Sequence, residues 1–367
     1  MGHTEIDRDR LRAWKRKGWQ SHFFFVLLRY ALHISEELPQ SISTTEWGEI
    51  YTIAQEQNVM GVLFAAIRRM PVALQPPHTL YLMWYAEAER IAQANELANE
   101  EAKRWTEVFA RLGASTCVLK GQGNALLYTE DGIRTPGDLD IYVEGGQERV
   151  MQLLEGLHLE GRVCEHHFHV DGKSGIPVEV HFKASQGSLN PQFNRRVQKW
   201  MEDELRTTVS TKDFYIPTPR FNRVMQLSHM QHHFVADGVS LRQLIDYYFV
   251  LKSEKCPDME QEMKWLGLNH FGQAVMHVMR TVFWLDKEHL PVHPNRQRGK
   301  VLLDAVMQKG SFGKYHAVSF DDWPFIARNI RHTLVLIYYC WLFPNEYSII
   351  WSNYWKNFYK KHHVRRA

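Results

Sequence analysis

Residues 115–143 read STCVLKGQGNALLYTEDGIRTPGDLDIYV, and this stretch decides the fold of the 367-residue chain. It begins with a short apolar run, Thr116–Leu119, which predicts a buried strand. A Lys-Gly-Gln-Gly tetrad and residues 124–128 follow, and they predict a tight loop and a brief helix. The apolar residues of Leu139–Val143 lie between turn-forming pairs and predict a second strand. The stretch therefore predicts strand, glycine loop, helix and strand in that order.

The pattern continues for about forty residues beyond this stretch. Residues 148–157 predict a helix, and the runs Val163–Val170 and Val178–Phe182 predict two strands. The segment between these runs, residues 171–175, consists of turn formers, which favours antiparallel pairing of the two strands. We therefore expect a compact α/β core from residue 115 to about residue 185.

Both flanks of this core have helical periodicity. Residues 47–70 predict a pair of amphipathic helices, and residues 79–112 predict one long helix that Gly113 ends. In the second flank, Ser240 with Gln243 has the spacing of a capping box at the start of a helix. The expected organisation is an N-terminal helical region, an α/β core and a C-terminal helical region, at residues 1–112, 113–215 and 216–367.

The composition is that of an ordinary globular chain, with 44% hydrophobic and 23% charged residues. The 44 basic and 41 acidic residues leave a formal charge of +3, which makes a long nucleic acid a less favoured partner. The four cysteines lack zinc-type spacing and close pairing, as expected for a reducing compartment. Composition alone therefore excludes fibrous, disordered and disulfide-stapled proteins.

Location follows from two further features of the sequence. Residues 1–21 are polar and basic, unlike a secretory signal. The longest strongly apolar run, residues 334–343, is about half of the roughly 20 residues that a membrane helix requires. We expect a cytoplasmic protein without a transmembrane segment.

The most informative residues are Asp138 and Asp140. Side chains two apart on a strand share a face, so both carboxylates should point away from the core. Adjacent anions repel unless a cation lies between them, and oxygen ligands suit Mg²⁺ or Mn²⁺. Glu179 is the expected third carboxylate, because it alternates with apolar residues and shares its face with His181.

Three carboxylates on two strands can hold two metal ions, the arrangement that supports phosphoryl or nucleotidyl transfer. The phosphates would need a cradle next to the metal site. Gly121 and Gly123 allow close approach of the backbone, and Lys120 and Arg134 add positive charge. We expect these four residues to bind the phosphates of the donor.

The chain resembles the DNA-polymerase-β-type nucleotidyltransferase superfamily, specifically its largely uncharacterised bacterial branch. The residues that carry the resemblance are Leu119-Lys120-Gly121, Leu127-Tyr128, Arg134, Gly137-Asp138-Leu139-Asp140-Ile141-Tyr142-Val143, Val178-Glu179-Val180-His181 and Leu241-Arg242-Gln243-Leu244-Ile245-Asp246. The resemblance implies an α+β fold, in which a small mixed sheet is embedded in a mostly helical protein. It also implies Asp138 and Asp140 as metal ligands, Glu179 as the third carboxylate and a nucleoside triphosphate as donor. Gln122 departs from the pattern, because well-studied relatives have a phosphate-binding serine there.

A possible acceptor pocket includes histidines and one pair of charges. His229 and His233 have the four-residue helical spacing that can chelate a metal, although lining the pocket or packing is the favoured interpretation. His181 has the position to take a proton from the acceptor, and a purely structural role is the alternative. Arg242 and Asp246 form either an intrahelical ion pair or, by the resemblance, part of the site.

These observations predict a metal-dependent nucleotidyltransferase that uses a nucleoside triphosphate. The acceptor is open: a phosphorylated sugar or other small molecule, a protein hydroxyl or an RNA end would suit such a core. One alternative is a catalytically silent nucleotide-binding or regulatory protein of the same fold, which the substitution at Gln122 favours. Another is a toxin-type transferase that acts on tRNA or protein.

Overall fold

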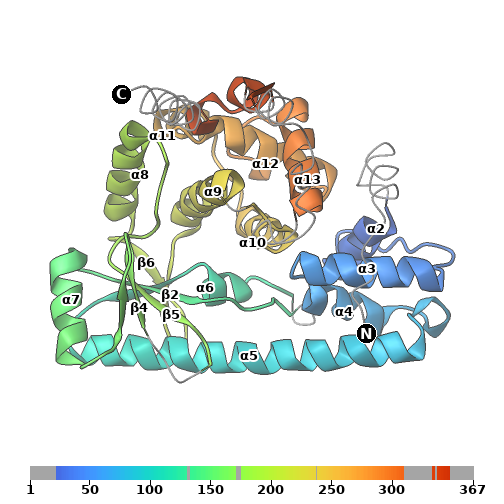
Figure 1. Cartoon of the computed structure of the whole chain (residues 1–367), viewed down its shortest axis with the longest axis horizontal. Helices are drawn as coiled ribbons and strands as arrows, with labels where there is room; N and C mark the ends of the chain where they lie inside the picture. Colours follow the sequence, from blue (N-terminus) through green and yellow to red (C-terminus); the bar gives the residue numbers. More distant parts are fainter. Residues whose placement is uncertain are drawn as a thin grey trace, which may run out of the picture.

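The fold is α+β, with a small mixed sheet surrounded by helices (Figure 1). The computed structural model describes residues 22–129, 133–170, 175–236, 238–309, 333–334 and 337–347. The strands are β1 (Thr116–Leu119), β2 (Leu139–Val143), β3 (Gly161–Val163), β4 (His167–Val170), β5 (Val178–His181), β6 (Thr208–Ser210) and β7 (Tyr215–Pro217). The helices before the sheet are α2 (Phe23–Ala31), α3 (Thr44–Glu56), α4 (Met60–Arg69), the 3-10 turn η2 (Val72–Leu74) and α5 (His78–Arg111). Those within and after it are α6 (Gly121–Ala125), α7 (Gly146–Gly156), α8 (Pro191–Glu204), α9 (Pro219–Ala236), α10 (Leu241–Lys252), α11 (Glu260–Leu266), α12 (Asn269–Thr281), the 3-10 turn η3 (Lys287–His289) and α13 (Arg296–Lys309).

The main sheet has five strands in the order β1-β2-β5-β4-β3. Strands β2 and β5 are parallel, and the other neighbours are antiparallel. The strands predicted at residues 116–119, 139–143 and 178–182 are therefore confirmed, as is the antiparallel pairing of the last with the run before it. The single strand predicted over Val163–Val170 is wrong. The chain turns back between Val163 and His167, so this run forms two strands that pair with each other.

Alternation along the strands gives the sheet two different faces. On one face, Val118, Ile141 and Val180 pack with apolar residues of α5 and α7 in a small core. On the other face lie Asp140 and Glu179, which line a cavity together with residues of α9 and α10. These two helices lie above the sheet in Figure 1. Polar residues of the sheet therefore face the C-terminal helices, while its apolar residues face α5.

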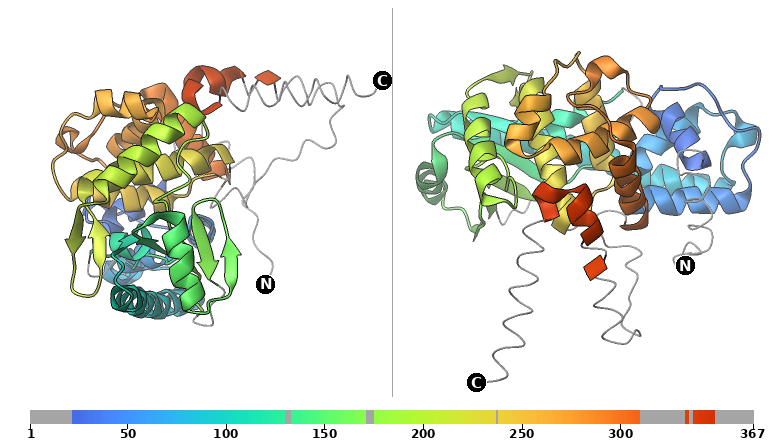
Figure 2. Two further views of the ribbon diagram at one scale, coloured as in Figure 1. Left: turned by 90° about the vertical axis from the view of Figure 1, so that its left-hand side faces the viewer. Right: turned by 90° about the horizontal axis from the view of Figure 1, so that it is seen from above.

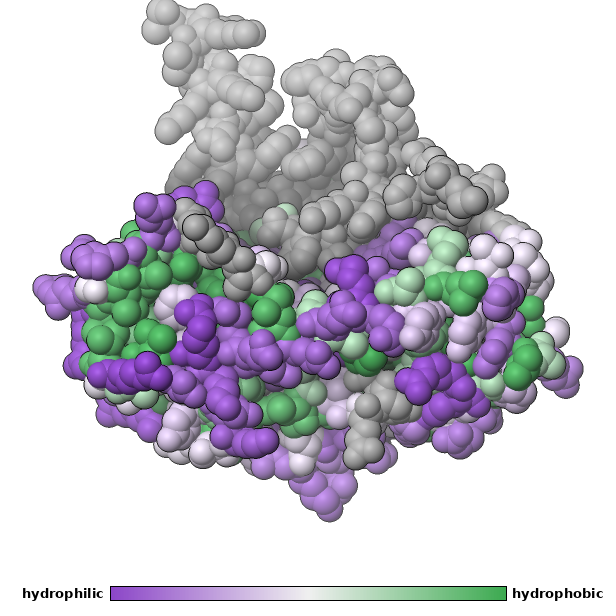
Figure 3. Space-filling view, turned by 90° about the horizontal axis from the view of Figure 1, so that it is seen from below, coloured by the Kyte–Doolittle hydropathy of each residue, from purple (hydrophilic) through white to green (hydrophobic). Residues whose placement is uncertain are grey.

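Helix α5 is 34 residues long and runs beneath both the sheet and the N-terminal helices (Figure 1). It has no internal Gly or Pro, and it ends at Arg111, two residues before Gly113, whose φ of 69° favours glycine. Its first half contributes Trp84 to the core of the N-terminal helices, and its second half contributes Trp105 and Phe109 to the core under the sheet. Hydrophilic residues predominate on the surface seen from below (Figure 3). The predicted long helix is confirmed, and it connects the two parts of the fold.

A larger core joins the N-terminal helices to the helices that follow the sheet. Two views at right angles show α8 to α13 grouped on one side of the sheet (Figure 2). The predicted helix pair at residues 47–70 is confirmed as α3 and α4, whereas α6 begins at Gly121 rather than at residue 124. None of the helices in the described part of the chain combines the length and the hydropathy needed to span a membrane. The domain boundaries at residues 112 and 215 stay a prediction.

Candidate active site

The carboxylates Asp140 and Glu179 are brought together by the parallel pairing of β2 with β5. In the register of this pair, Asp140 lies directly opposite Glu179. Because directly paired residues project on the same side of a sheet, both side chains reach the same space. Asp138 precedes β2 by one residue, is exposed, and lines the same cavity as the other two. The sheet therefore places three predicted carboxylates around one cavity.

Two cationic side chains contact Asp140. The Lys120 ammonium lies 3.0 Å from its Oδ1, and His181 Nε2 lies 2.9 Å from the same oxygen. Lys120 follows the end of β1 directly, in a left-handed conformation with φ of 45°, and Gly121 continues this conformation with φ of 27°. Since Leu119 is paired with Asp140, this turn keeps Lys120 beside the carboxylate. The Lys-Gly turn therefore brings an ammonium group to the carboxylate cluster.

The electrostatics differ among the carboxylates. Although Asp138 is exposed as a residue, partial burial of its carboxylate at the cavity raises its pKa, and the neighbouring charges of Asp140 and Glu179 raise it further. Burial acts in the same direction on Asp140, but Lys120 and His181 outweigh it and hold the pKa of Asp140 well below its usual range. Glu179 behaves similarly, because its hydrogen bond with His181 outweighs burial and lowers its pKa. Asp138 is thus the carboxylate whose charge is least compensated.

The histidines next to these carboxylates also have shifted pKa values. Burial would lower the pKa of His181, but hydrogen bonds to Asp140 and Glu179 raise it. Burial lowers the pKa of His166 to about 3, with a further contribution from His181, and burial also lowers that of His167. His167 Nε2 lies 3.4 Å from Glu179 Oε1. The cluster therefore combines one imidazole favoured as a cation with two favoured as neutral bases.

The opposite end of the cavity is built around a buried ion pair between Arg134 and Asp246. The guanidinium donates from Nε to Oδ1 at 2.8 Å and from Nη2 to Oδ2 at 2.9 Å, and the Tyr128 hydroxyl donates to Oδ1 at 2.7 Å. Arg242 donates from Nη1 to the Thr135 carbonyl, and its buried Nε has no hydrogen-bond partner in the described structure. Asp246 therefore pairs with Arg134, and the intrahelical pair with Arg242 considered from the sequence is not the one formed.

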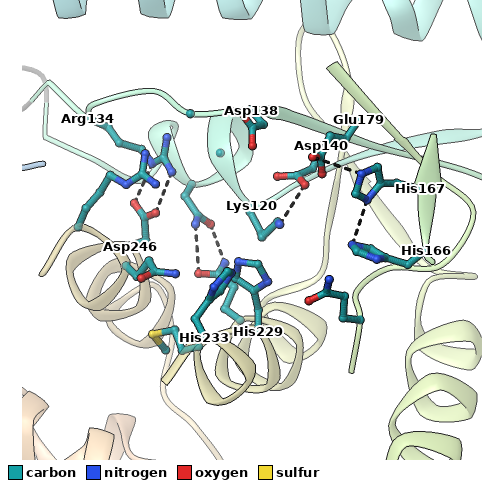
Figure 4. A pocket seen from close by; sticks show the side chains of 18 residues that line it. Lys120, Arg134, Asp138, Asp140, His166, His167, Glu179, His229, His233 and Asp246 are labelled. Atoms are coloured by element: carbon teal, nitrogen blue, oxygen red, sulfur yellow. Dashed lines mark hydrogen bonds and ion pairs between the residues drawn. The ribbon is translucent and has the colours of Figure 1, made fainter. Parts of the chain in front are cut away.

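The third wall of the cavity belongs to α9. His229 and His233 lie across the cavity from Lys120 (Figure 4), with ring centroids 4.4 Å apart. Burial holds the pKa of His229 well below its usual range, and Lys120 adds to the effect. Asn124 and Gln226 form a reciprocal pair of amide hydrogen bonds, at 3.1 and 2.7 Å, that joins α6 to α9. These hydrogen bonds therefore hold α6, which follows the glycine loop, against α9, which carries His229 and His233.

Most of the residues that the sequence singles out line one cavity of about 230 Å³. Its lining includes Lys120, Gly121, Arg134, Asp138, Asp140, Glu179, His229, His233, Arg242 and Asp246. Two predicted residues are not part of the lining. Gly123 packs with its α-carbon against the Val118 carbonyl and Ile216, where a Cβ would come within 3.2 Å of the carbonyl oxygen. His181 is only 1% exposed and lies behind the carboxylates.

His166 lines the cavity but is absent from the sequence-based site. The sequence predicts one continuous strand over residues 163–170, in which the neighbouring His166 and His167 would point to opposite faces of the sheet. Because the chain turns before β4, His166 and His167 both lie at the cavity. Gln186 and Gln226 also line it, and no local sequence signal marks them. Gln243 lines it too, although the sequence marks this residue only through its helix cap and the family resemblance. A prediction of the turn at Cys164 would have identified His166.

Comparison with known protein families identifies the family of this chain. A family model described as "Uncharacterised nucleotidyltransferase" matches residues 43–283, more than half of the chain. The chain belongs to this nucleotidyltransferase family. The match extends from α3 to the end of α12 and so includes every residue that lines the cavity.

Similarity to solved structures and to curated proteins is weak or absent. The chain is similar to a solved structure, an antigenic nucleotidyltransferase-like protein from Paracoccidioides brasiliensis, with a TM-score of 0.36 and 12% sequence identity. That similarity covers 55% of this chain and 96% of the other. No curated protein matches the sequence significantly.

Proposed function

We propose that this protein is a divalent-metal-dependent nucleotidyltransferase that moves a nucleoside monophosphate from a nucleoside triphosphate to an acceptor. The observation that carries the proposal is the cross-strand pair Asp140 and Glu179, with Asp138 beside it, in the lining of one polar cavity. Membership of a nucleotidyltransferase family supports the same class of reaction. The acceptor is not identified by either observation.

The carboxylates fit a hard divalent ion. Three carboxylate side chains supply oxygen donors, and the raised pKa of Asp138, caused first by burial and then by its acidic neighbours, indicates uncompensated negative charge. Such donors suit Mg²⁺ or Mn²⁺. When bound, these ions polarise phosphate oxygens and favour ionisation of an attacking hydroxyl. We assign Asp138, Asp140 and Glu179 as the residues that hold the metal.

Two cationic side chains are suited to bind the triphosphate. Lys120 has a flexible stem and can move its ammonium from Asp140 to a phosphate oxygen when a metal ion compensates the carboxylate. The guanidinium of Arg242 lies in the cavity lining beside Gly137 and has N–H groups not used by any carboxylate in the described structure. The guanidinium of Arg134, by contrast, is occupied by Asp246. We therefore assign phosphate binding to Lys120, Gly121 and Arg242, and a positioning role to Arg134.

In this proposal the acceptor binds on the side of the cavity that α9 forms. His229 and His233 face Lys120 across the cavity (Figure 4), and the lowered pKa of His229, caused by burial, keeps its imidazole neutral. A neutral imidazole can accept a proton from a hydroxyl group that attacks the α-phosphate. We propose that these two histidines line the acceptor subsite.

The proposal is tested by incubation of the purified protein with each α-³²P-labelled nucleoside triphosphate, Mg²⁺ and cell extract. Wild type is compared with Asp140→Asn, and Glu144→Gln serves as the matched control, because Glu144 follows the other end of β2. Label transfer by wild type and the control, but not by Asp140→Asn, is the expected result. Equal labelling with all three proteins, or none with any, would overturn the proposal.

Separation of the labelled products by size then identifies the acceptor class. Label in the small-molecule fraction indicates a metabolite such as a phosphorylated sugar. Label in the protein fraction indicates modification of a hydroxyl side chain, and label in the RNA fraction indicates the tRNA-modifying, toxin-type alternative. The same experiment therefore distinguishes the classes of acceptor that the sequence leaves open.

A second function, nucleotide binding without turnover, is favoured by the orientation of Gln122. Its Nε2 donates to Asn99 Oδ1 on α5 at 2.8 Å, and Gln122 is not part of the cavity lining. The position at which well-studied relatives have a phosphate-binding serine thus supplies no side chain to the cavity. Calorimetric binding of a nucleoside triphosphate, with no labelled product from any acceptor fraction, would support this function over the first.

A further inference from the structure

Three histidines lie immediately beside the carboxylates. His166 and His167 are at the start of β4, and His181 is at the end of β5, directly opposite His167. The ring centroids lie 4.5 Å apart for His166 and His167, and 5.2 Å apart for each of these with His181. One ring nitrogen from each lies within 4.8 Å of the others, which is close enough for a single ion to contact all three.

Glu179 offers a fourth metal ligand beside the three histidines. Its Oε1 lies 3.4 Å from His167 Nε2, and its Oε2 lies 3.4 Å from His181 Nε2. Two donor atoms bound tetrahedrally to one ion at about 2.0–2.1 Å are themselves about 3.4 Å apart. Each of the two imidazoles therefore has one oxygen of Glu179 at the distance that separates two ligands of a tetrahedral ion.

The hydrogen bonds of His181 orient it as a ligand. Its Nδ1 lies 3.1 Å from the Lys183 carbonyl oxygen, which accepts only if this nitrogen carries the proton. Metal-bound histidines usually donate their second N–H to such an acceptor, which fixes the tautomer. Its Nε2 faces the oxygens of Asp140 and Glu179, at 2.9 and 3.4 Å. Without metal, a proton on Nε2 satisfies these contacts, and a bound divalent ion would take the place of that proton.

His166 provides independent evidence for a ligand. It is only 8% exposed, and its Nδ1 has no hydrogen-bond partner among the described residues. A buried polar atom without a partner costs about 1–3 kcal/mol, so an unpaired imidazole nitrogen beside other donors calls for an explanation. Its Nε2 lies 3.1 Å from His167 Nδ1, so the two rings are already in contact at the cluster. A metal ion bound to His166 would supply a partner for its unpaired Nδ1.

We propose that His166, His167 and His181, with Glu179 as the fourth ligand, bind a divalent transition metal of the Zn²⁺ and Co²⁺ class. Imidazole nitrogen is a preferred ligand of these ions and a poor one for Mg²⁺. Glu179 then belongs to both this position and the oxygen-rich position at Asp138 and Asp140. The inference rests on the metal role of Glu179 in the proposed function and adds a second, chemically distinct ion to it.

Metal binding by the full-length protein, without nucleotide, tests the inference. After removal of metals with a chelator, Zn²⁺ binding is measured by calorimetry in excess Mg²⁺, and Co²⁺ binding by its visible absorption spectrum. Each of His166→Asn and His167→Asn should weaken Zn²⁺ binding at least about 100-fold, since loss of an outer-shell partner alone costs 10- to 100-fold. Both should also remove the absorption bands of four-coordinate Co²⁺.

Two histidine substitutions elsewhere provide controls. His158→Asn changes an exposed histidine in a left-handed turn that Asn tolerates, and His229→Asn removes one member of the other histidine pair. Neither should change the affinity for Zn²⁺ by more than about twofold. A loss with His229→Asn that equals the loss with His166→Asn would assign the ion elsewhere and overturn the inference.

Misfolding is distinguished from ligand loss by thermal unfolding with and without Zn²⁺. Zn²⁺ should raise the Tm of wild type and leave the Tm of His166→Asn unchanged, while the two proteins have similar Tm values in chelator. Zn²⁺ binding that is equal in wild type and in both variants contradicts the inference even if nucleotidyl transfer occurs. Conversely, Zn²⁺ binding that depends on His166 supports it even if no transfer is found.

Discussion

The two ends of the cavity contain buried charges that are arranged in opposite ways. At one end, Asp246 receives two hydrogen bonds from Arg134 and one from Tyr128, so its charge is fully compensated by groups fixed in place. At the other end, the carboxylates Asp138, Asp140 and Glu179 outnumber the ammonium group of Lys120, which contacts Asp140. The first end resembles a structural ion pair and the second resembles a site that requires a cation.

The difference indicates which charges serve folding and which serve chemistry. Arg134 and Asp246 are 112 residues apart in sequence, and their bidentate contact joins the segment before β2 to α10. Such a buried pair is costly to break, because the remaining partner stays desolvated. The carboxylate end instead keeps Asp138 exposed and only partly compensated, which favours ligand binding over stability. Substitutions at the two ends should therefore have opposite consequences.

The largest expected effect is that of Asp138→Asn on activity. This substitution should lower kcat/KM for nucleotidyl transfer more than about 1,000-fold, beyond the loss caused by removing one oxyanion donor. It should not lower stability. Burial and acidic neighbours raise the pKa of Asp138, so stability is greatest with the protonated carboxyl and is lost as the pH rises through that pKa. Asn should therefore raise the Tm in chelator at pH 8 and have no such effect at low pH.

The proposed contrast between the two ends of the cavity would be contradicted if Asp138→Asn lowered both stability and activity. Transfer rates and thermal unfolding must therefore be measured on the same preparations. A variant with a lower Tm at pH 8 would place Asp138 among the structural charges, like Asp246.

The next largest effect is that of Asp246→Ala on stability. This change leaves the buried Arg134 without its partner and should cost about 3–5 kcal/mol of the free energy of unfolding. Urea denaturation monitored by circular dichroism measures the loss. Asp203→Ala is the matched control, because Asp203 pairs with Lys199 and Arg206 on the surface and should change stability by less than about 0.5 kcal/mol. Equal losses for the two variants would contradict a structural role for the buried pair.

Another buried carboxyl, Glu346, shows what happens without a close cationic partner among the described residues. Burial raises its pKa to about 7, against its hydrogen bond from Gln231, and its Oε2 has no hydrogen-bond partner in the described part of the chain. Because this pKa lies above the unfolded value, stability is present in full below the unfolded pKa and decreases as the pH rises to about 7. Glu346→Gln should therefore stabilise the protein at pH 8, by no more than about 3 kcal/mol.

The gain from Glu346→Gln should disappear near pH 4, where the carboxyl is protonated in both the folded and unfolded states. Denaturant unfolding at both pH values provides the check. A gain that is the same at the two pH values would show that packing, rather than the charge, limits stability at this position.

The sequence predicts the carboxylate end of the cavity much better than the Arg134 end. Alternation along β2 and β5 is a local property, and it correctly places Asp140, Glu179 and His181 on the polar face of the sheet. The α+β fold and the long helix α5 follow from equally local patterns. The sequence does not predict that His166 lies at the cavity, because the turn at Cys164 depends on the pairing of β3 with β4. Local alternation therefore identifies a face but not the points where a strand is interrupted.

The ion pair of Arg134 with Asp246 has no local signal at all. Sequence spacing suggests Arg242 as the partner of Asp246, because the two lie four residues apart on a helix. The fold instead brings Arg134 from a distant loop into a better bidentate geometry with Asp246. Roles that depend on which of two arginines is already paired can be assigned only after the chain is folded.

The smallest expected effect concerns Arg242, which this pairing leaves available for the donor phosphates. Arg242→Lys keeps the positive charge but loses the planar group that can bind two phosphate oxygens. We expect the KM for the nucleoside triphosphate to rise about tenfold, the equivalent of about 1.4 kcal/mol, with kcat changed less than about twofold. Steady-state kinetics over a range of nucleotide concentrations separate the two parameters.

Arg134→Lys, which perturbs the structural pair, should instead lower the Tm and leave the KM of the folded fraction near that of wild type. If Arg134→Lys raised KM and Arg242→Lys did not, the assignment of the two arginines would have to be exchanged.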